Sequence, residues 1–513
     1  MRDFQTRAYS AGLIATLGVL LAVLTGLVIG GGAAALQFSD PGPVIRFGVP
    51  LAKALMNIAM AVSIGSLVFA AFAANDKSTV LRKLLNLASA AAAVWAIAAS
   101  VHFVLSFVSV SGAEFSLEQS FSQGLWVYAT EIELGISLAL NLLAAFAISI
   151  LALSVSSLTA TALTAALGLG SLIPLALIGH AAGTANHSLA VNSLGLHLVG
   201  IVTWVGGLVA VFALKKDLLG EARPMLSRYS SLALAGFVIV AVSGIGSSYV
   251  RIPDAAGLFS PYGQLLFIKV VLLVILGGFG AIYRTRILSK ISEKGSFFKL
   301  ALLEIFIMGS AIGMGTALAR TAPPVSQGEF IVPSPAQLLT GEPLPPEFTM
   351  VTFFTQWKLD ILWGLIALWA IGAYLVAVRR LKARGDSWPV ARTISWVSGM
   401  LVLIFVTSGS LNVYQEYLFS IHMVAHMFLT MAIPVLLVPG APVTLLTRAV
   451  QKRADSSRGV REWVLWAVHT KYAEFVSHPL VAAVNFAGSL VVFYFTPLFD
   501  WATREHIGHQ WMI

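Results

Sequence analysis

Long runs of apolar residues alternate with short polar segments along nearly the whole chain. About fourteen of these runs could cross a bilayer, because a spanning helix needs about 20 apolar residues. The pattern therefore predicts an all-α, polytopic integral membrane protein with two helical bundles. The approximate helix cores are 11–33, 51–74, 84–109, 125–153, 158–181, 190–214, 230–250, 262–283, 298–318, 353–378, 389–411, 419–438, 478–498 and a last one from about 504.

One polar interval differs from the others. The segment from Arg320 to Thr349 is rich in Pro, Gly, Ser and Glu, which is typical of an irregular linker. About nine predicted helices precede it and about five follow it. We therefore expect membrane domains at residues 1–320 and 351–513, joined by a linker outside the cytoplasm at 321–350. The last predicted helix is cut short at Ile513, so we expect the C-terminal domain to be truncated.

Composition supports the membrane assignment and excludes several functions. Of 513 residues, 58% are hydrophobic and 11% charged, and the mean hydropathy is +0.87, far above that of soluble proteins. The chain has no cysteine, which excludes disulfides, thiolate metal sites and cysteine catalysis. The net charge of +9 does not indicate a nucleic-acid partner, because the basic residues lie in short loops between apolar runs.

The basic loops also predict the orientation. Most of the 32 Lys and Arg residues fall on the same side as the N-terminus, and basic loops stay in the cytoplasm. We therefore expect a cytoplasmic N-terminus, and a first helix that is retained rather than cleaved as a signal peptide. In this orientation all ten histidines except His469 and His478 lie towards the outer face, which favours chemistry there.

The stretch HMVAHMFLTMAIPVLLVPGAP, residues 422–442, carries two histidines in an apolar run. His422 and His426 are four residues apart, so both imidazoles share one helical face. Met423 and Met427 have the same spacing, one position further round. Imidazole and thioether ligands suit copper, with Cu(I) favoured, rather than magnesium or calcium. The alternative is a histidine pair that packs helices, with methionine as filler.

A second candidate site lies in the N-terminal half, within GHAAGTANHSLAVNSLGLHLVGIVTWVGGL, residues 179–208. His180, His187 and His197 could ligate one metal near an outer hairpin. Trp204 lies two helical turns after His197 and shares its face. The following pair Gly206-Gly207 should let another backbone come close. The alternative is a polar loop followed by one buried, hydrogen-bonded histidine.

Three further carboxylates and a second histidine pair belong to the candidate chemistry. His506 and His509 are three residues apart and share a face, at the depth predicted for His422 and His426. The two pairs could form one four-nitrogen site or two separate two-coordinate sites. Asp360 could support such a site or simply pair with Lys358. Glu131 and Glu133 could attract cations. Alternatively, they could cap a helix or snorkel to the membrane surface.

Two resemblances cover most of the chain. GHA…H…H…WVGGL, together with residues 228–286, resembles the copper resistance D (CopD) family, best over roughly residues 180–290. This resemblance implies copper handling, often uptake across the inner membrane, with His180, His187 and His197 on the family's histidine positions. Residues 350–513 resemble the CtaG family, through the W..D opening, the HM..HM helix, the GAPV turn, the HPL start and the YFTPLF end. This implies copper insertion into cytochrome c oxidase.

The resemblances imply an actinobacterial fusion protein in the bacterial cytoplasmic membrane. We expect copper uptake or transfer, and delivery to a cytochrome c oxidase subunit or a periplasmic copper chaperone. No Walker A pattern is present, so we expect any transport to be passive or ion-coupled. We expect no enzymatic activity, because transfer between histidine sites needs no covalent chemistry. The alternatives are a membrane scaffold and a haem b electron-transfer protein. Haem needs axial ligands on opposite sides of the ring, whereas both histidine pairs share one face.

Overall fold

The computed structural model describes residues 2–35, 40–76, 78–178, 186–218, 220, 222–252, 254–282, 296–324, 334–340 and 342–513. Over these ranges the chain is helical, and its one β contact is an isolated bridge between Asn75 and Ser457. Contacts divide the chain into two compact units. Unit 1 comprises Met1–Thr184, Ser193–Gln327 and Asp455–Ser457, and unit 2 comprises Ala185–Asn192, Gly328–Ala454 and Arg458–Ile513.

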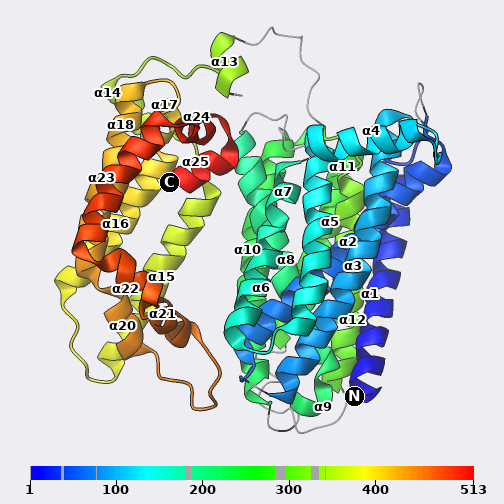
Figure 1. Cartoon of the computed structure of the whole chain (residues 1–513), viewed down its shortest axis with the longest axis horizontal. Helices are drawn as coiled ribbons and strands as arrows, with labels where there is room; N and C mark the ends of the chain where they lie inside the picture. Colours follow the sequence, from blue (N-terminus) through cyan, green and yellow to red (C-terminus); the bar gives the residue numbers. More distant parts are fainter. Residues whose placement is uncertain are drawn as a thin grey trace. The chain divides into compact units, whose positions relative to one another are not determined.

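The helices of unit 1 come from the N-terminal part of the chain (Figure 1). They are α1 (Arg2–Ile29), α2 (Pro43–Ala73), α3 (Thr79–Ser111), α4 (Gln119–Glu131), α5 (Glu133–Ser154), α6 (Leu158–Gly170), α7 (Leu172–Leu177), α8 (His187–Ala213), α9 (Lys215–Leu218), α10 (Pro224–Arg251), the 3₁₀ helix η1 (Ala256–Phe259), α11 (Pro261–Ile282) and α12 (Ser296–Leu318). The first residues of α8, up to Asn192, belong to unit 2.

The helices of unit 2 follow in the C-terminal part. They are α13 (Pro335–Thr340), α14 (Met350–Thr355), α15 (Ile361–Ala383), α16 (Val390–Ser408), α17 (Ser410–Tyr414), α18 (Phe419–Met427), the π-helical turn η3 (Phe428–Ala432), α19 (Ile433–Leu437), the 3₁₀ turn η4 (Val438–Gly440), α20 (Pro442–Ala449), α21 (Val460–Val468), α22 (Lys471–Ser477), α23 (Pro479–Phe495), α24 (Pro497–Arg504) and α25 (His506–Met512).

The prediction of an all-α, multi-pass membrane protein is confirmed. Among the described residues, 12 helices are long and apolar enough to cross a membrane, or up to 13 if the bent pair α22–α23 is one span. This is slightly fewer than the fourteen expected. The segment after residue 504 differs most, because the chain is extended at Glu505 and α25 has only seven residues.

Unit 1 is held together by close helix contacts at small residues. Gly206 of α8 lies against Ala61 and Gly65 of α2. A Cβ atom on Gly206 would clash with the Ala61 carbonyl oxygen and would lie 2.8 Å from Gly65 Cα. The sequence predicts such a close approach at Gly206, and the structure confirms it. Because lipid tails are as apolar as leucine, close packing of this kind is a main driving force for association of membrane helices.

The core of unit 2 lies between α15, α16 and the helix that begins with α18. Ala367, Leu403, Ala425 and Ile433 are buried together there. The helix continues from α18 through a π turn into α19, where the Ile433 N–H donates to the Phe428 carbonyl. Pro434 follows directly. Proline lacks an N–H and its ring crowds the carbonyl four residues earlier, so a wide turn at this place relieves the conflict.

Candidate functional site

His422 is the most deeply buried histidine of α18, with 5% of its surface exposed. Its ring stacks on Phe419 and meets the edge of Phe499 of α24, with centroids 5.9 and 5.7 Å apart. Within the described part of the chain, its Nε2 atom is buried and has no hydrogen-bond partner. A buried polar atom of this kind costs free energy unless something binds it. This unpartnered nitrogen makes His422 a candidate ligand.

Two other histidines lie near His422. His426 follows one helical turn later and contacts the ring of Tyr494 in α23, at a centroid distance of 6.0 Å. His426 and His509 are both close enough to His422 to interact with it electrostatically. The structure thus brings three of the four predicted nitrogen donors into one neighbourhood. It does not preassemble them, since no group of three or more His, Asp or Glu side chains that could hold a metal ion occurs among the described residues.

His509 of α25 is held by an amide chain. Its Nε2 lies 3.5 Å from Gln415 Nε2, which also donates to Asn412 Oδ1 at 2.8 Å. An amide nitrogen only donates, so His509 Nε2 accepts this bond and is unprotonated. Burial lowers the pKa of His509 to about 4, and the charge of Lys358 adds to the effect, whereas Asp360 opposes it. His509 is therefore neutral near pH 7, the form that binds metals.

His506, at the start of α25, makes different contacts. Its Nε2 lies 2.9 Å from Asn192 Oδ1, and its ring meets the edge of the His187 ring at 5.7 Å. Both partners belong to the short segment of α8 that is part of unit 2. Burial, with contributions from His187, His509 and Lys358, lowers the pKa of His506 to about 4. His506 Nε2 is thus directed to Asn192, and the four nitrogen donors of the expected site are not gathered into one cluster among the described residues.

Asp360 ties α25 to the start of α15. One carboxylate oxygen accepts from the Leu362 and Trp363 N–H groups and caps α15. The other accepts from Gln510 Nε2 at 3.0 Å, and Gln510 Oε1 accepts from Trp363 Nε1 at 2.9 Å. Lys358, the alternative partner of Asp360, instead lies 3.8 and 3.5 Å from two glutamates, Glu342 and Glu416. Asp360 thus positions the helix that carries His509.

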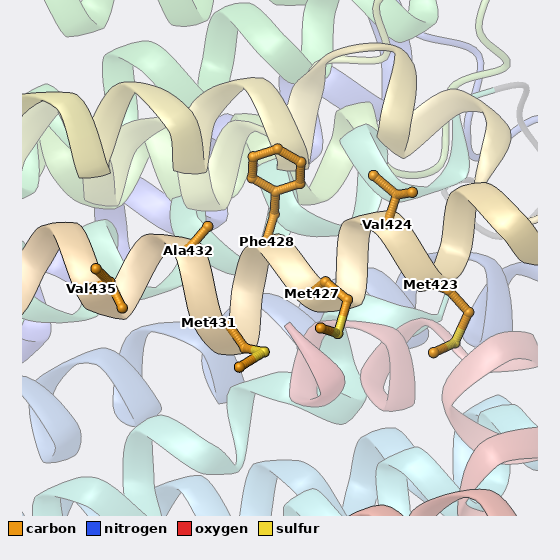
Figure 2. A pocket seen from close by; sticks show the side chains of 7 residues that line it. All are labelled: Met423, Val424, Met427, Phe428, Met431, Ala432 and Val435. Atoms are coloured by element: carbon orange, nitrogen blue, oxygen red, sulfur yellow. The ribbon is translucent and has the colours of Figure 1, made fainter.

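The methionines of this helix lie beside the histidines. Met423, Met427 and Met431 line a groove of about 490 Å³ on the flank of the helix, and Figure 2 shows their side chains on the same side. The Met423 sulfur accepts a hydrogen bond from the Tyr494 hydroxyl at 3.5 Å. Tyr494 therefore touches both the histidine cluster and the methionine groove.

The histidines of the N-terminal half do not form the expected three-histidine site. His180 lies outside the described residues. His187 and His197 stand ten residues apart on the single helix α8, a separation of about 15 Å at 1.5 Å per residue. They cannot ligate one ion, and His197 Nδ1 instead lies 3.0 Å from Ser243 Oγ of α10. His197 is half-buried and hydrogen-bonded, which agrees with the alternative in part.

The other candidates of that half have separate surroundings. Trp204 is buried, its ring meets the edge of Phe237 at 5.5 Å, and its carbonyl accepts from Tyr229. Glu131 and Glu133 are exposed on either side of Ile132, where α4 ends and α5 begins. Trp204 therefore packs helices together, and the two glutamates sit at a helix break.

Residue patterns alone did not reveal the amides that bond the histidines or position their helix: Asn192, Gln415 and Gln510. Each was visible as a polar residue near or within an apolar run, which usually needs a partner. Nothing in the spacing shows which partner it takes, because Asn192 and His506 are 314 positions apart. The sequence spacing likewise does not predict the contacts of Tyr494 and Phe499 with the histidine rings.

Comparison with known proteins locates three family regions. Residues 42–191 match the copper resistance protein D-like N-terminal domain, residues 223–318 match copper resistance protein D, and residues 372–513 match the cytochrome c oxidase caa3 assembly factor. No solved structure matches the chain.

The similar proteins come from mycobacteria. An uncharacterized protein of Mycobacterium leprae is 42% identical over 173 residues, which is 34% of this chain and 26% of that protein. Uncharacterized proteins of Mycobacterium bovis and Mycobacterium tuberculosis are each 38% identical over 211 residues, or 39% of this chain and 32% of theirs. The aligned part thus spans about a quarter to a third of these relatives' length. The chain is a multi-pass membrane protein in which two regions that match copper resistance protein D models precede, in the same polypeptide, a region that matches the cytochrome c oxidase caa3 assembly factor.

Proposed function

We propose that this protein handles copper as cargo at the outer face of the bacterial cytoplasmic membrane and delivers it for cytochrome c oxidase assembly. Its N-terminus would be cytoplasmic, as the basic loops predict. The family regions support a copper-related role. The observation that carries the site is the buried His422 Nε2, which has no hydrogen-bond partner in the described residues and lies near His426 and His509.

In this proposal His422, His426 and His509 offer neutral imidazoles to copper. Copper with imidazole and thioether ligands follows the ligand preferences of the metal. Because the three rings are close but not preassembled, binding would draw them together and remain weak enough for release. Transfer then needs only exchange of one ligand for another, so no covalent step or enzymatic activity is required.

His187 and His506 would form a second copper-binding site, with two nitrogen ligands. Their rings lie 5.7 Å apart, and Asn192 orients His506 through the bond to its Nε2. His187 belongs to the copper resistance region and His506 to the oxidase assembly region. Cargo that reaches His187 would therefore pass to a histidine on the same short helix as His509. His180 and His197 would take part in uptake.

The test is copper retention by the purified full chain after loading with Cu(I). We expect the double variant H422A/H426A to lose the nitrogen-bound copper, measured by elemental analysis. The matched control is H469A/H478A, since both of these histidines are exposed and have no place in the proposed site. Unchanged copper in H422A/H426A would remove the assignment, and a Soret band in the purified protein would favour haem instead.

A further inference from the structure

The methionines of α18 and the following π turn are not core filler. Met427 and Met431 are 48% and 47% exposed, whereas Met56 and Met60 in the core of unit 1 are 1% exposed. Together with Met423 they line a groove whose other walls are apolar carbons from Val424, Phe428, Ala432 and Val435. Sulfur is therefore the only donor atom that the lining side chains offer (Figure 2).

The π turn keeps these sulfurs in line. In an α-helix, each step of four residues turns the position by about 40° because there are 3.6 residues per turn. A third methionine would then drift away from the first. The wide turn over Phe428–Ala432 takes up an additional residue and reduces this drift for Met431. Figure 2 shows the side chains of Met423, Met427 and Met431 on one side of the helix. Turns of this kind often occur at functional sites.

The chemistry of the groove selects a soft cation. Thioethers are neutral, polarisable ligands that favour Cu(I), while carboxylate and carbonyl oxygens favour Mg²⁺ or Ca²⁺. Side chains four residues apart on a helix have Cβ atoms about 5–6 Å apart, so two flexible methionines can reach one ion. Met423 and Met427 also lie within about 12 Å of the start of α18, which keeps a bound charge near one end of the span.

The groove adjoins the histidine cluster at one end. The Tyr494 hydroxyl donates to the Met423 sulfur at 3.5 Å, and the Tyr494 ring contacts His426 at 6.0 Å. Only the Tyr494 side chain therefore separates an ion on Met423 from the nitrogen ligand His426. Exchange between the two sets would need no change of oxidation state.

We propose that Met423, Met427 and Met431 form a sulfur-only site for a soft monovalent ion, Cu(I) or its surrogate Ag(I), separate from the nitrogen cluster and next to it. The identity of the physiological cargo rests on the proposed function, but the sulfur site can be tested without it.

The test uses the purified full chain loaded with Cu(I) or titrated with Ag(I). We expect the triple variant M423L/M427L/M431L to bind one ion fewer per chain and to lose the sulfur scatterers seen by X-ray absorption at the copper edge. Leucine replaces methionine with little change of volume. The control is M350L, because Met350 is 77% exposed and lies outside the groove. M427L/M431L, which leaves the Met423–Tyr494 bond intact, should weaken Ag(I) binding at least about tenfold.

The sulfur site and the histidine site can each be disproved without affecting the other. H422A/H426A should lose nitrogen scatterers and keep sulfur scatterers, and the triple methionine variant should do the reverse. Sulfur scatterers that persist in the triple variant, or an unchanged ion count, would overturn the sulfur site alone. Nitrogen scatterers that are absent from the wild-type protein would overturn the proposed histidine site and leave the sulfur site standing. Thermal unfolding of each variant shows whether it is folded.

Discussion

At the scale of single residues, the histidines of this chain share one chemistry and have different surroundings. His197 bonds Ser243, His506 lies against Asn192, and His509 accepts from Gln415. His422 has a buried nitrogen without a partner in the described part of the chain. The free energy of burying a polar atom is offset only when a partner is supplied, so these histidines differ in their readiness to bind an ion.

The copper-retention prediction belongs to this scale. Replacing His422 and His426 removes two of the three imidazoles of the proposed site. The aromatic rings of Phe499 and Tyr494 that surround the site remain. The expected result is loss of copper with a folded protein. The exposed pair His469 and His478 tests whether any two histidines would have the same effect.

Asp360 allows a stability prediction. Asp360→Ala removes the cap of α15 and leaves the Gln510 amide without its carboxylate. The expected loss is about 0.5–2 kcal/mol for the cap and about 0.5–1.5 kcal/mol for the hydrogen bond to the half-buried amide, measured by thermal unfolding in detergent. Asp360→Asn should lose less, because an asparagine oxygen still caps the helix.

The control for this comparison is Asp386→Ala. Asp386 and Arg448 form an exposed ion pair at 3.6 Å, which contributes about 0–1 kcal/mol. If Asp360→Ala and Asp386→Ala lowered stability equally, Asp360 would not position α25.

At the scale of helices, small residues and prolines decide how segments meet. Gly206 lets α8 approach α2, whereas Pro434 accompanies the π turn between α18 and α19. Both residues are visible in the sequence. The consequence of Gly206 was predicted, because a missing side chain implies close packing. The π turn was not, since proline in a helix can be accommodated by a kink, a break or a wide turn.

A glycine pair tests the helix contact. Gly206→Ala should lower stability by about 1–3 kcal/mol, because its Cβ has no room beside α2. Gly278→Ala, within α11 of the same unit, is the control because nothing lies within 4 Å of its Cβ position. That change should be neutral or stabilising by up to about 1 kcal/mol. Equal unfolding temperatures of the two variants would argue against a tight α2–α8 contact.

At the scale of the whole molecule, the orientation in the membrane determines which sites face outward. The chain has no cysteine, so a single introduced cysteine reports its own side of the membrane. Leu117 is 98% exposed after α3, and Lys452 is exposed after α20. The predicted topology places residue 117 outside and residue 452 in the cytoplasm.

In intact cells, a membrane-impermeant maleimide should label the Leu117→Cys variant and spare the Lys452→Cys variant. After permeabilisation both should react, which controls for accessibility. The reverse pattern would invert the topology and place the histidine cluster on the cytoplasmic side.

Some features of this protein were determined by its sequence alone. A bilayer requires long apolar runs whose backbone hydrogen bonds close within each helix, so spans are a local signal that can be read along the chain. The spacing of His422 and His426, and the family motifs, are local in the same sense. The all-α membrane fold and both family regions were therefore predictable.

The tertiary structure alone decided which of these groups meet. His509 lies near His422, Gln510 bonds Asp360 and His506 faces Asn192, although long stretches of chain separate the partners. Such contacts depend on how helices pack and where short terminal helices fold back, and spacing within one helix carries no information about them. Helix geometry also separates His187 and His197, which are close in sequence but ten residues, or about 15 Å, apart along α8.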